Sequence, residues 1–191
     1  MTIHSRRIGI VCLCGAMMVT AAATASATTL LRMSLAKMAH TAKVIARARC
    51  VGSSANWDAG EIWTFTTFDA EETWRGTTPA RFTVRLLGGR LGNLTASVSG
   101  VPRFRIGEDV ILFLEPTARG DFSVVGWEQG TFRIKRDPRT GEASATQDSA
   151  AFATFDPVTR QFKVEGIEQM PLTTLRARIA LLLRAGAGSE Q

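Results

Sequence analysis

Apolar and polar residues alternate along most of the chain between residues 43 and 164, and this period of two is typical of β-strands with one buried face. From Lys43 to Cys50 the alternation places small apolar residues on one face and mainly basic residues on the other. Val110–Leu114 differs, because it is apolar at every position, which predicts a central strand with both faces buried. The pattern predicts strands at residues 43–50, 61–69, 81–87, 110–114, 121–125, 130–136, 151–155 and 161–164.

Segments rich in glycine, proline and aspartate separate these strands. Gly52–Gly60 is polar and bounded by glycines, which predicts a turn. Gly88 and Gly89 follow a strand directly, but no helix comes after them, so we expect a bulge or a tight barrel corner rather than a phosphate-binding loop. Asp137–Gly141 and Asp156–Thr159 each begin with Asp followed by Pro, which predicts two further turns.

Helical periodicity is confined to two segments near the ends of the chain. Ser34 precedes Leu35–Ala42 and has the hydroxyl of a good N-cap, so a short helix is expected there as a lid over one end of the core. From Leu172 to Arg184, leucine and isoleucine recur at helical spacing with arginines between them. We expect this amphipathic helix to pack on the strands, with binding of a partner protein as the alternative.

The N-terminus has the three parts of a secretory signal peptide. Arg6 and Arg7 form the positive region, Ile8–Ala23 the apolar region, and Ala25–Ala27 a small-x-small cleavage site. Cleavage leaves a mature chain that starts at Thr28, so residues 1–27 are interpreted as signal and 28–191 as a single domain. The protein is therefore expected to be exported, to the periplasm or beyond the cell. The alternative is an uncleaved anchor helix, although the many Ala, Thr and Gly residues make the apolar region weakly hydrophobic.

Cleavage also changes what the composition implies. With 191 residues, 45% of them hydrophobic, the chain is long enough to bury the core of one ordinary domain. Cys12 and Cys14 leave with the signal, so Cys50 remains alone and no internal disulfide can form. Loss of Arg6 and Arg7 lowers the net charge from +6 to about +4, which is too weak to indicate a polyanion by itself. No membrane span is expected after cleavage.

Seven motifs in the strand and turn segments carry a resemblance. They are Lys43-Val-Ile-Ala-Arg-Ala-Arg, Trp63-Thr-Phe-Thr, Glu72-Thr-Trp-Arg-Gly76, Thr83-Val-Arg-Leu-Leu-Gly-Gly89, Pro102-Arg-Phe-Arg-Ile-Gly-Glu108, Val110-Ile-Leu-Phe-Leu114 and Gly130-Thr-Phe-Arg-Ile134. In these the chain resembles a group of exported bacterial proteins of unknown function, which are similar to OB-fold-like β-barrels. The resemblance implies a fold and no activity. Tissue metalloproteinase inhibitors share this shape but use an N-terminal cysteine and several disulfides, which a chain starting at Thr28 lacks.

The mature chain is poor in residues that carry catalysis. Its single histidine is His40 and it has no tyrosine, which argues against metal sites built from His or Cys clusters. A Ser–His site or a Cys50–His40 site remains a minor alternative, because no nucleophile motif surrounds His40. The acid pairs at 71–72 and 108–109 are neighbours on strands, so their side chains point to opposite faces and do not form a glycosidase pair. No enzyme activity, cofactor or metal is therefore expected.

Basic residues at alternate, outward positions of the expected strands are the strongest indication of function. With nearby tryptophans they predict a binding face for an anionic ligand, since OB barrels bind oligonucleotides and oligosaccharides by charge and aromatic stacking. Export makes nucleic acid an unlikely ligand and leaves an anionic glycan of the envelope or a secreted protein partner. The alternative is that the arginines pair with nearby acids such as Asp58, Glu61, Glu71 and Glu72. The candidate face consists of Arg47, Arg49, Arg81, Arg85, Arg103, Arg105, Arg133, Lys135, Trp63, Trp74 and Trp127.

The expectation is thus a mainly β protein, with a single OB-like β-barrel, a short N-terminal helix and a C-terminal amphipathic helix. Its expected function is that of a non-catalytic, exported binding or interaction module. The alternative is an accessory or inhibitor domain for a secreted hydrolase.

Overall fold

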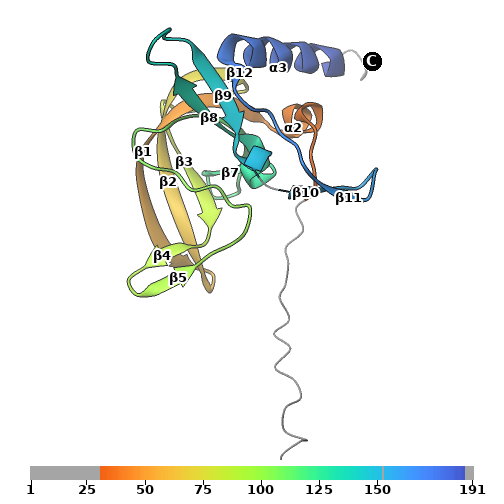
Figure 1. Cartoon of the computed structure of the whole chain (residues 1–191). Coiled ribbons are helices and arrows are strands. Elements are labelled where there is room, and N and C mark those ends of the chain that lie inside the picture. Colours follow the sequence, from red (N-terminus) through yellow and green to blue (C-terminus); the bar gives the residue numbers. More distant parts are fainter. Residues whose placement is uncertain (1–30, 152, 188–191) are drawn as a thin grey trace, which may run out of the picture.

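The structure is a computed structural model that describes residues 31–151 and 153–187. It is mainly β, with an eight-stranded mixed sheet, a short helix near the start and a longer helix at the end of the chain (Figure 1). The predicted signal peptide and the expected first residue, Thr28, lie outside the described residues. The mainly β class and both terminal helices are confirmed.

The eight strands of the main sheet lie in the order β1-β2-β3-β7-β6-β8-β9-β12. Two further pairs, β4 with β5 and β10 with β11, form small separate sheets. The strands are β1 (Val44–Asp58), β2 (Glu61–Arg75), β3 (Arg81–Leu87), β4 (Gly89–Leu91), β5 (Leu94–Ala96), β6 (Asp109–Pro116), β7 (Phe122–Val124), β8 (Thr131–Arg136), β9 (Ala143–Gln147), β10 (Ala153–Asp156), β11 (Gln161–Val164) and β12 (Met170–Pro171).

Five of these strands form a partial ring, because β1 pairs with β6 as well as with β2. The ring runs through β1, β2, β3, β7 and β6. All its contacts are antiparallel except the one between β3 and β7, which is a single parallel pair of Val84 with Phe122. The brevity of β7 leaves the ring weakly joined at this point.

The apolar side chains form two cores, one on each side of β1 and β6. β6 is apolar on both faces, as the continuous apolar pattern of 110–114 predicts, whereas β1 contributes to the outer core only through Ile45. Val110, Leu112 and Leu114 face the inside of the ring, whereas Ile111 and Phe113 belong to the outer core. The alternation of residues 43–50 places Ile45 on the face with the basic residues, which was expected to be exposed. This expectation is wrong for Ile45, because its side chain is buried in the outer core.

The two helices cover the outer core. Helix α2 (Leu35–Thr41) begins at Ser34, whose hydroxyl accepts a hydrogen bond from the Lys37 amide at 3.1 Å, as expected of an N-cap. Helix α3 (Leu172–Ala187) packs beside α2 and buries Leu175 and Ile179 in the same core. The expected packing of the C-terminal helix on the strands is therefore confirmed.

The predicted turn at Gly52–Gly60 is wrong. Strand β1 continues to Asp58 and forms a long hairpin with β2, and the turn itself is only Ala59 and Gly60. Both turn residues have positive φ angles, 51° and 86°, which matches the right-handed twist of the two strands. The polar residues of β1 remain extended because β2, rich in threonine and aromatic residues, provides a partner along its whole length.

Three shorter segments also differ from expectation. The stretch around Arg103 and Arg105 is a loop, held by a hydrogen bond from the Gly107 amide to the Cys50 carbonyl at 2.8 Å. Strand β9 was not predicted, because its sequence Ala-Ser-Ala-Thr-Gln carries almost no hydrophobic signal. Two short 3₁₀ helices, η1 (Trp127–Gly130) and η2 (Asp148–Ala151), are also present, and η2 includes Ala151, the first residue of the strand expected at 151–155.

Candidate functional site

The basic residues of the candidate face are mostly engaged with carboxylates. The side chain of Arg47 is only 16% exposed and lies 3.0 Å from Glu71 and 2.5 Å from Asp109. Arg49 lies 2.8 Å from Glu71, and Arg81 lies 2.6 Å from Asp69. These pairs cross between neighbouring strands, so the positive charge of each arginine is compensated within the sheet itself.

Two further arginines lie in denser networks. Arg85 is 11% exposed and contacts Asp58 at 2.6 Å and Asp121 at 3.3 Å. Hydrogen bonds from Arg119 and Arg85 hold the pKa of Asp58 below its ordinary value. Arg133 binds both Glu108 and Asp148, the latter at 2.8 Å.

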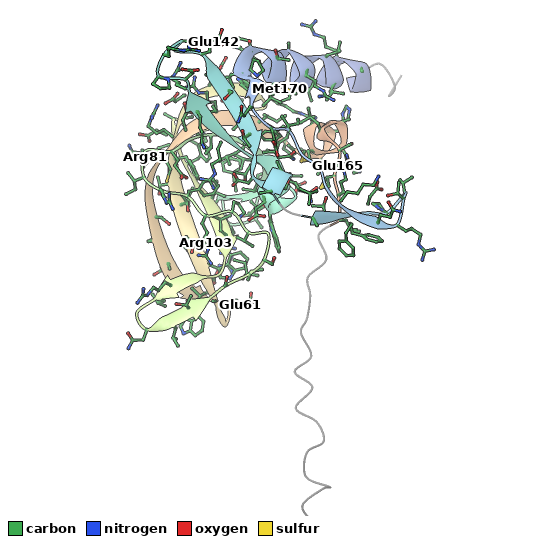
Figure 2. All side chains as sticks on the ribbon, viewed as in Figure 1. Glu61, Arg81, Arg103, Glu142, Glu165 and Met170 are labelled. Atoms are coloured by element: carbon green, nitrogen blue, oxygen red, sulfur yellow. The ribbon has the colours of Figure 1, made fainter. Side chains whose placement is uncertain are left out.

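The remaining members of the candidate face do not gather in one place. Arg103 and Arg105 are exposed on the loop before β6, and Lys135 is exposed on β8 (Arg103 is labelled in Figure 2). Trp74 packs against the outer core, whereas Trp127 packs against the inner core. The structure therefore does not assemble the eleven predicted residues into one continuous basic and aromatic surface.

Strands β2 and β3 do bring part of the predicted face together. The guanidinium of Arg85 lies 4.6 Å from the ring centre of Trp63 and 5.5 Å from that of Phe65. The register explains this contact, because Phe65 lies opposite Arg85 and Trp63 lies opposite Leu87. The result is an aromatic platform that holds Arg85 in place on its neighbouring acids.

An apolar groove, which the sequence analysis missed, lies between the tip of the β1–β2 hairpin and the β4–β5 hairpin. Its volume is about 360 Å³. Trp57 and Leu94 stand on its rim with 59% and 56% of their surface exposed. Its walls include Ile62, Leu87 and Val98, and the carboxylate of Glu61 is the only charged group among its lining residues. The signal available in the sequence was Trp57, a large apolar residue within the predicted polar turn.

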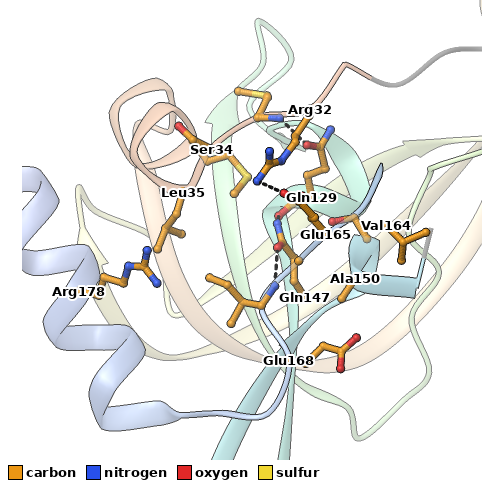
Figure 3. Close-up of a pocket in the computed structure, with 15 residues that line it drawn as sticks. Arg32, Ser34, Leu35, Gln129, Gln147, Ala150, Val164, Glu165, Glu168 and Arg178 are labelled. Atoms are coloured by element: carbon orange, nitrogen blue, oxygen red, sulfur yellow. Dashed lines mark hydrogen bonds and ion pairs between the residues drawn. The ribbon is translucent and has the colours of Figure 1, made fainter. Parts of the chain in front are cut away.

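A second cavity, of about 540 Å³, lies between α2, α3 and the segment that follows β11 (Figure 3). Two nearly buried glutamines support its walls. The Gln129 amide group accepts a hydrogen bond from the Met33 amide at 2.7 Å and donates to the Leu31 carbonyl at 2.8 Å. Gln147 likewise donates to the Gln129 carbonyl and accepts from the Ile167 amide, at 2.6 and 3.2 Å. Both amide side chains thus hold backbone segments, which offsets the cost of burying them.

The structure does not bring the expected minor alternative, Cys50 with His40, together. Cys50 lies in the inner core, where burial raises the pKa of its thiol, and its sulfur contacts the Gly52 carbonyl at 3.9 Å. His40 is exposed on α2, outside the ring. Within residues 31–151 and 153–187, no group of three or more His, Cys, Asp or Glu residues could hold a metal ion.

Among the described helices, none is long and apolar enough to cross a membrane. Comparison of the chain with protein-family models and with curated proteins gives no match.

Proposed function

We propose that the protein is an exported, non-catalytic binding module built on an OB-like barrel, and that it binds a protein partner at the apolar groove. The partial ring of five strands supports the OB assignment, since an OB fold is a five-stranded, partly open barrel. The resemblance to exported bacterial proteins agrees with this architecture.

The exposure of Trp57 and Leu94 on the groove is the observation that carries the proposal. Exposed aromatic side chains beside an apolar pocket are typical of the centre of a protein–protein interface. A polyanionic ligand is less well supported, because carboxylates already pair with Arg47, Arg85 and Arg133. We therefore favour a protein partner over an anionic glycan.

The position of the groove on the ring also fits this proposal. OB barrels bind their ligands on the face of the second and third strands and on adjacent loops. In this chain β2 and β3 carry the Trp63–Arg85 platform, and the β1–β2 turn and Leu87, the last residue of β3, border the groove. Platform and groove are therefore neighbours on the surface that such a barrel uses.

The test is capture of exported proteins on the immobilised mature chain with three baits. These are the wild type, the double variant Trp57→Ser with Leu94→Ser, and Ile106→Ser as a matched control. Ile106 is 75% exposed on the loop before β6 and lines neither the groove nor the larger cavity. We expect one protein to be retained by the wild type and the control and lost from the double variant.

The retained protein is then purified and its affinity for the three baits measured by calorimetry. Loss of the two groove side chains is expected to weaken binding at least about 30-fold, as truncation of central interface residues does. Equal affinities for all three baits would contradict the proposal. If the partner is a hydrolase, its turnover with and without the module decides between an accessory and an inhibitor role.

A further inference from the structure

We propose that the cavity between α2 and α3 is a second binding site, which takes a small zwitterion with an apolar body. This chemistry is shared by short peptides and free amino acids. The cavity shares no lining residue with the groove of Trp57 and Leu94. The inference therefore goes beyond the proposed function and does not depend on it.

The cavity has the size and rigidity of a ligand site. Its volume of about 540 Å³ is within the usual range for small-molecule pockets. The hydrogen bonds of Gln129 and Gln147 to the backbone hold two of its walls in position. A ligand therefore meets a formed site and does not have to order it, which lowers the entropic cost of binding.

Three polar side chains on the cavity are without a partner in the described part of the chain. The guanidinium of Arg178, on α3, points toward the cavity in Figure 3, and no carboxylate pairs with it. The carboxylate of Glu168 lines the cavity and is likewise unpaired there. Ser149 is only 4% exposed, and its hydroxyl makes no hydrogen bond with the described residues. Arg178 and Glu168 are exposed and the Ser149 hydroxyl is not sealed from solvent, so a ligand can reach all three groups.

The other charges on the cavity are already compensated. Arg32 lies 2.6 Å from Glu165 and 3.6 Å from Asp156, so neither Arg32 nor Glu165 is available as a free charge (Figure 3). Among the described lining residues, Arg178 and Glu168 thus remain as one cation and one anion without an ion pair. A simple anion would meet the uncompensated Glu168, and a simple cation would meet Arg178. A zwitterion satisfies both, with its carboxylate on Arg178 and its ammonium group on Glu168.

Apolar side chains complete the site. Met33, Leu35, Met38 and Ile167 also line the cavity, and methionine side chains adapt readily to ligands of different shape. We therefore expect a hydrophobic side chain in the ligand, as in leucine or a peptide that contains it.

The proposal is tested by calorimetry with four probes on the mature chain: the tripeptide leucyl-glycyl-glycine, its N-acetyl form, its C-terminal amide, and free leucine. We expect the unblocked tripeptide to bind at least about tenfold more tightly than either blocked form, because each block removes one charge-assisted contact. Free leucine separates the two ligand sources, since tighter binding of leucine indicates an amino-acid site and tighter binding of the tripeptide a peptide site. The proposal is overturned if neither unblocked probe binds at millimolar concentration.

Substitutions then assign each end of the ligand to one residue. Arg178→Gln is expected to abolish the preference for the free carboxylate over the amide and to keep the preference for the free amine, and Glu168→Gln to do the reverse. Arg176→Gln is the matched control, because Arg176 lies on the same helix but pairs with Glu72 at 2.5 Å and does not line the cavity. If the Arg176 and Arg178 variants lost the preference for the free carboxylate equally, the proposed site would be contradicted. The Trp57 and Leu94 double variant should bind the tripeptide as the wild type does. The cavity proposal therefore stands even if the groove binds no protein partner.

Discussion

At the scale of single residues, the main finding is that partners distant in the sequence compensate the outward arginines. Arg47 binds Asp109, which is 62 positions away, and Arg85 binds Asp58, which is 27 positions away. The alternation of the strands predicts that these arginines point outward, but it contains no information on which acid lies opposite. Asp58 was expected as a partner, whereas Asp109 was not. Charge at the surface of this protein is therefore decided by strand register.

Glu128 provides a test of burial at this scale. Burial, and then the charge of Asp148, raise the pKa of Glu128 above the ordinary 4.5. The charged form is disfavoured in the folded state, so ionised Glu128 destabilises the protein. This destabilisation is fully present above the folded pKa and disappears below pH 4.5. Glu128→Gln is thus expected to raise the free energy of unfolding at pH 7 and to have no such effect at pH 4.

Urea denaturation at both pH values measures this effect, with Glu142→Gln as the control. Glu142 is exposed near the start of β9, and its substitution is expected to change stability little at either pH. A gain for Glu128→Gln that is equal at both pH values would contradict the assignment to its ionisation.

At the scale of elements, the α3 helix and the β1–β2 hairpin show opposite outcomes of the same reasoning. The helix was predicted closely because leucine and isoleucine at helical spacing report directly on its buried face. The second half of β1 was predicted as a turn because glycine, serine and asparagine favour turns locally. Its strand conformation comes from pairing with β2, a tertiary effect that local propensity does not contain.

Helix α3 allows a matched pair of substitutions. Leu175 is fully buried in the outer core, whereas Leu181 is 67% exposed on the same helix. We expect Leu175→Ala to lower the free energy of unfolding by about 3 kcal/mol through lost burial and a cavity. Leu181→Ala is expected to change it by less than about 0.5 kcal/mol. Urea denaturation measures both values, and equal losses would show that α3 does not pack as described.

At the scale of the whole molecule, the ring and its two cores decide which surfaces are available for binding. β6 and the first residues of β1 are covered on both sides, and the exposed apolar side chains Trp57 and Leu94 lie at the hairpins that extend from the end of the ring (Figure 1). Ion pairs cover much of the ring surface, although the formal net charge of the chain is +6. Net charge alone therefore overstates the affinity of this protein for polyanions.

Heparin chromatography tests this conclusion. We expect the chain from Thr28 onward to elute at or below about 0.15 M salt, because carboxylates already pair with most of the basic residues of the candidate face. Glu71→Gln removes a partner of both Arg47 and Arg49, and it should increase retention more than Glu142→Gln, which makes the same change in net charge. Strong retention of the wild type, or equal increases in retention for both variants, would contradict this conclusion and support the predicted basic face.

Local sequence patterns are sufficient to predict the β class, the two terminal helices, most strand positions and the double-sided burial of Val110–Leu114. These properties follow from the local periodicity of apolar residues, which each segment carries within itself. Tertiary structure alone decided the partial ring, the pairing of the arginines, the exposure of Trp57 and the cavity beside α2 and α3. Each of these depends on register and packing between segments far apart in the chain, and no local pattern encodes such distances.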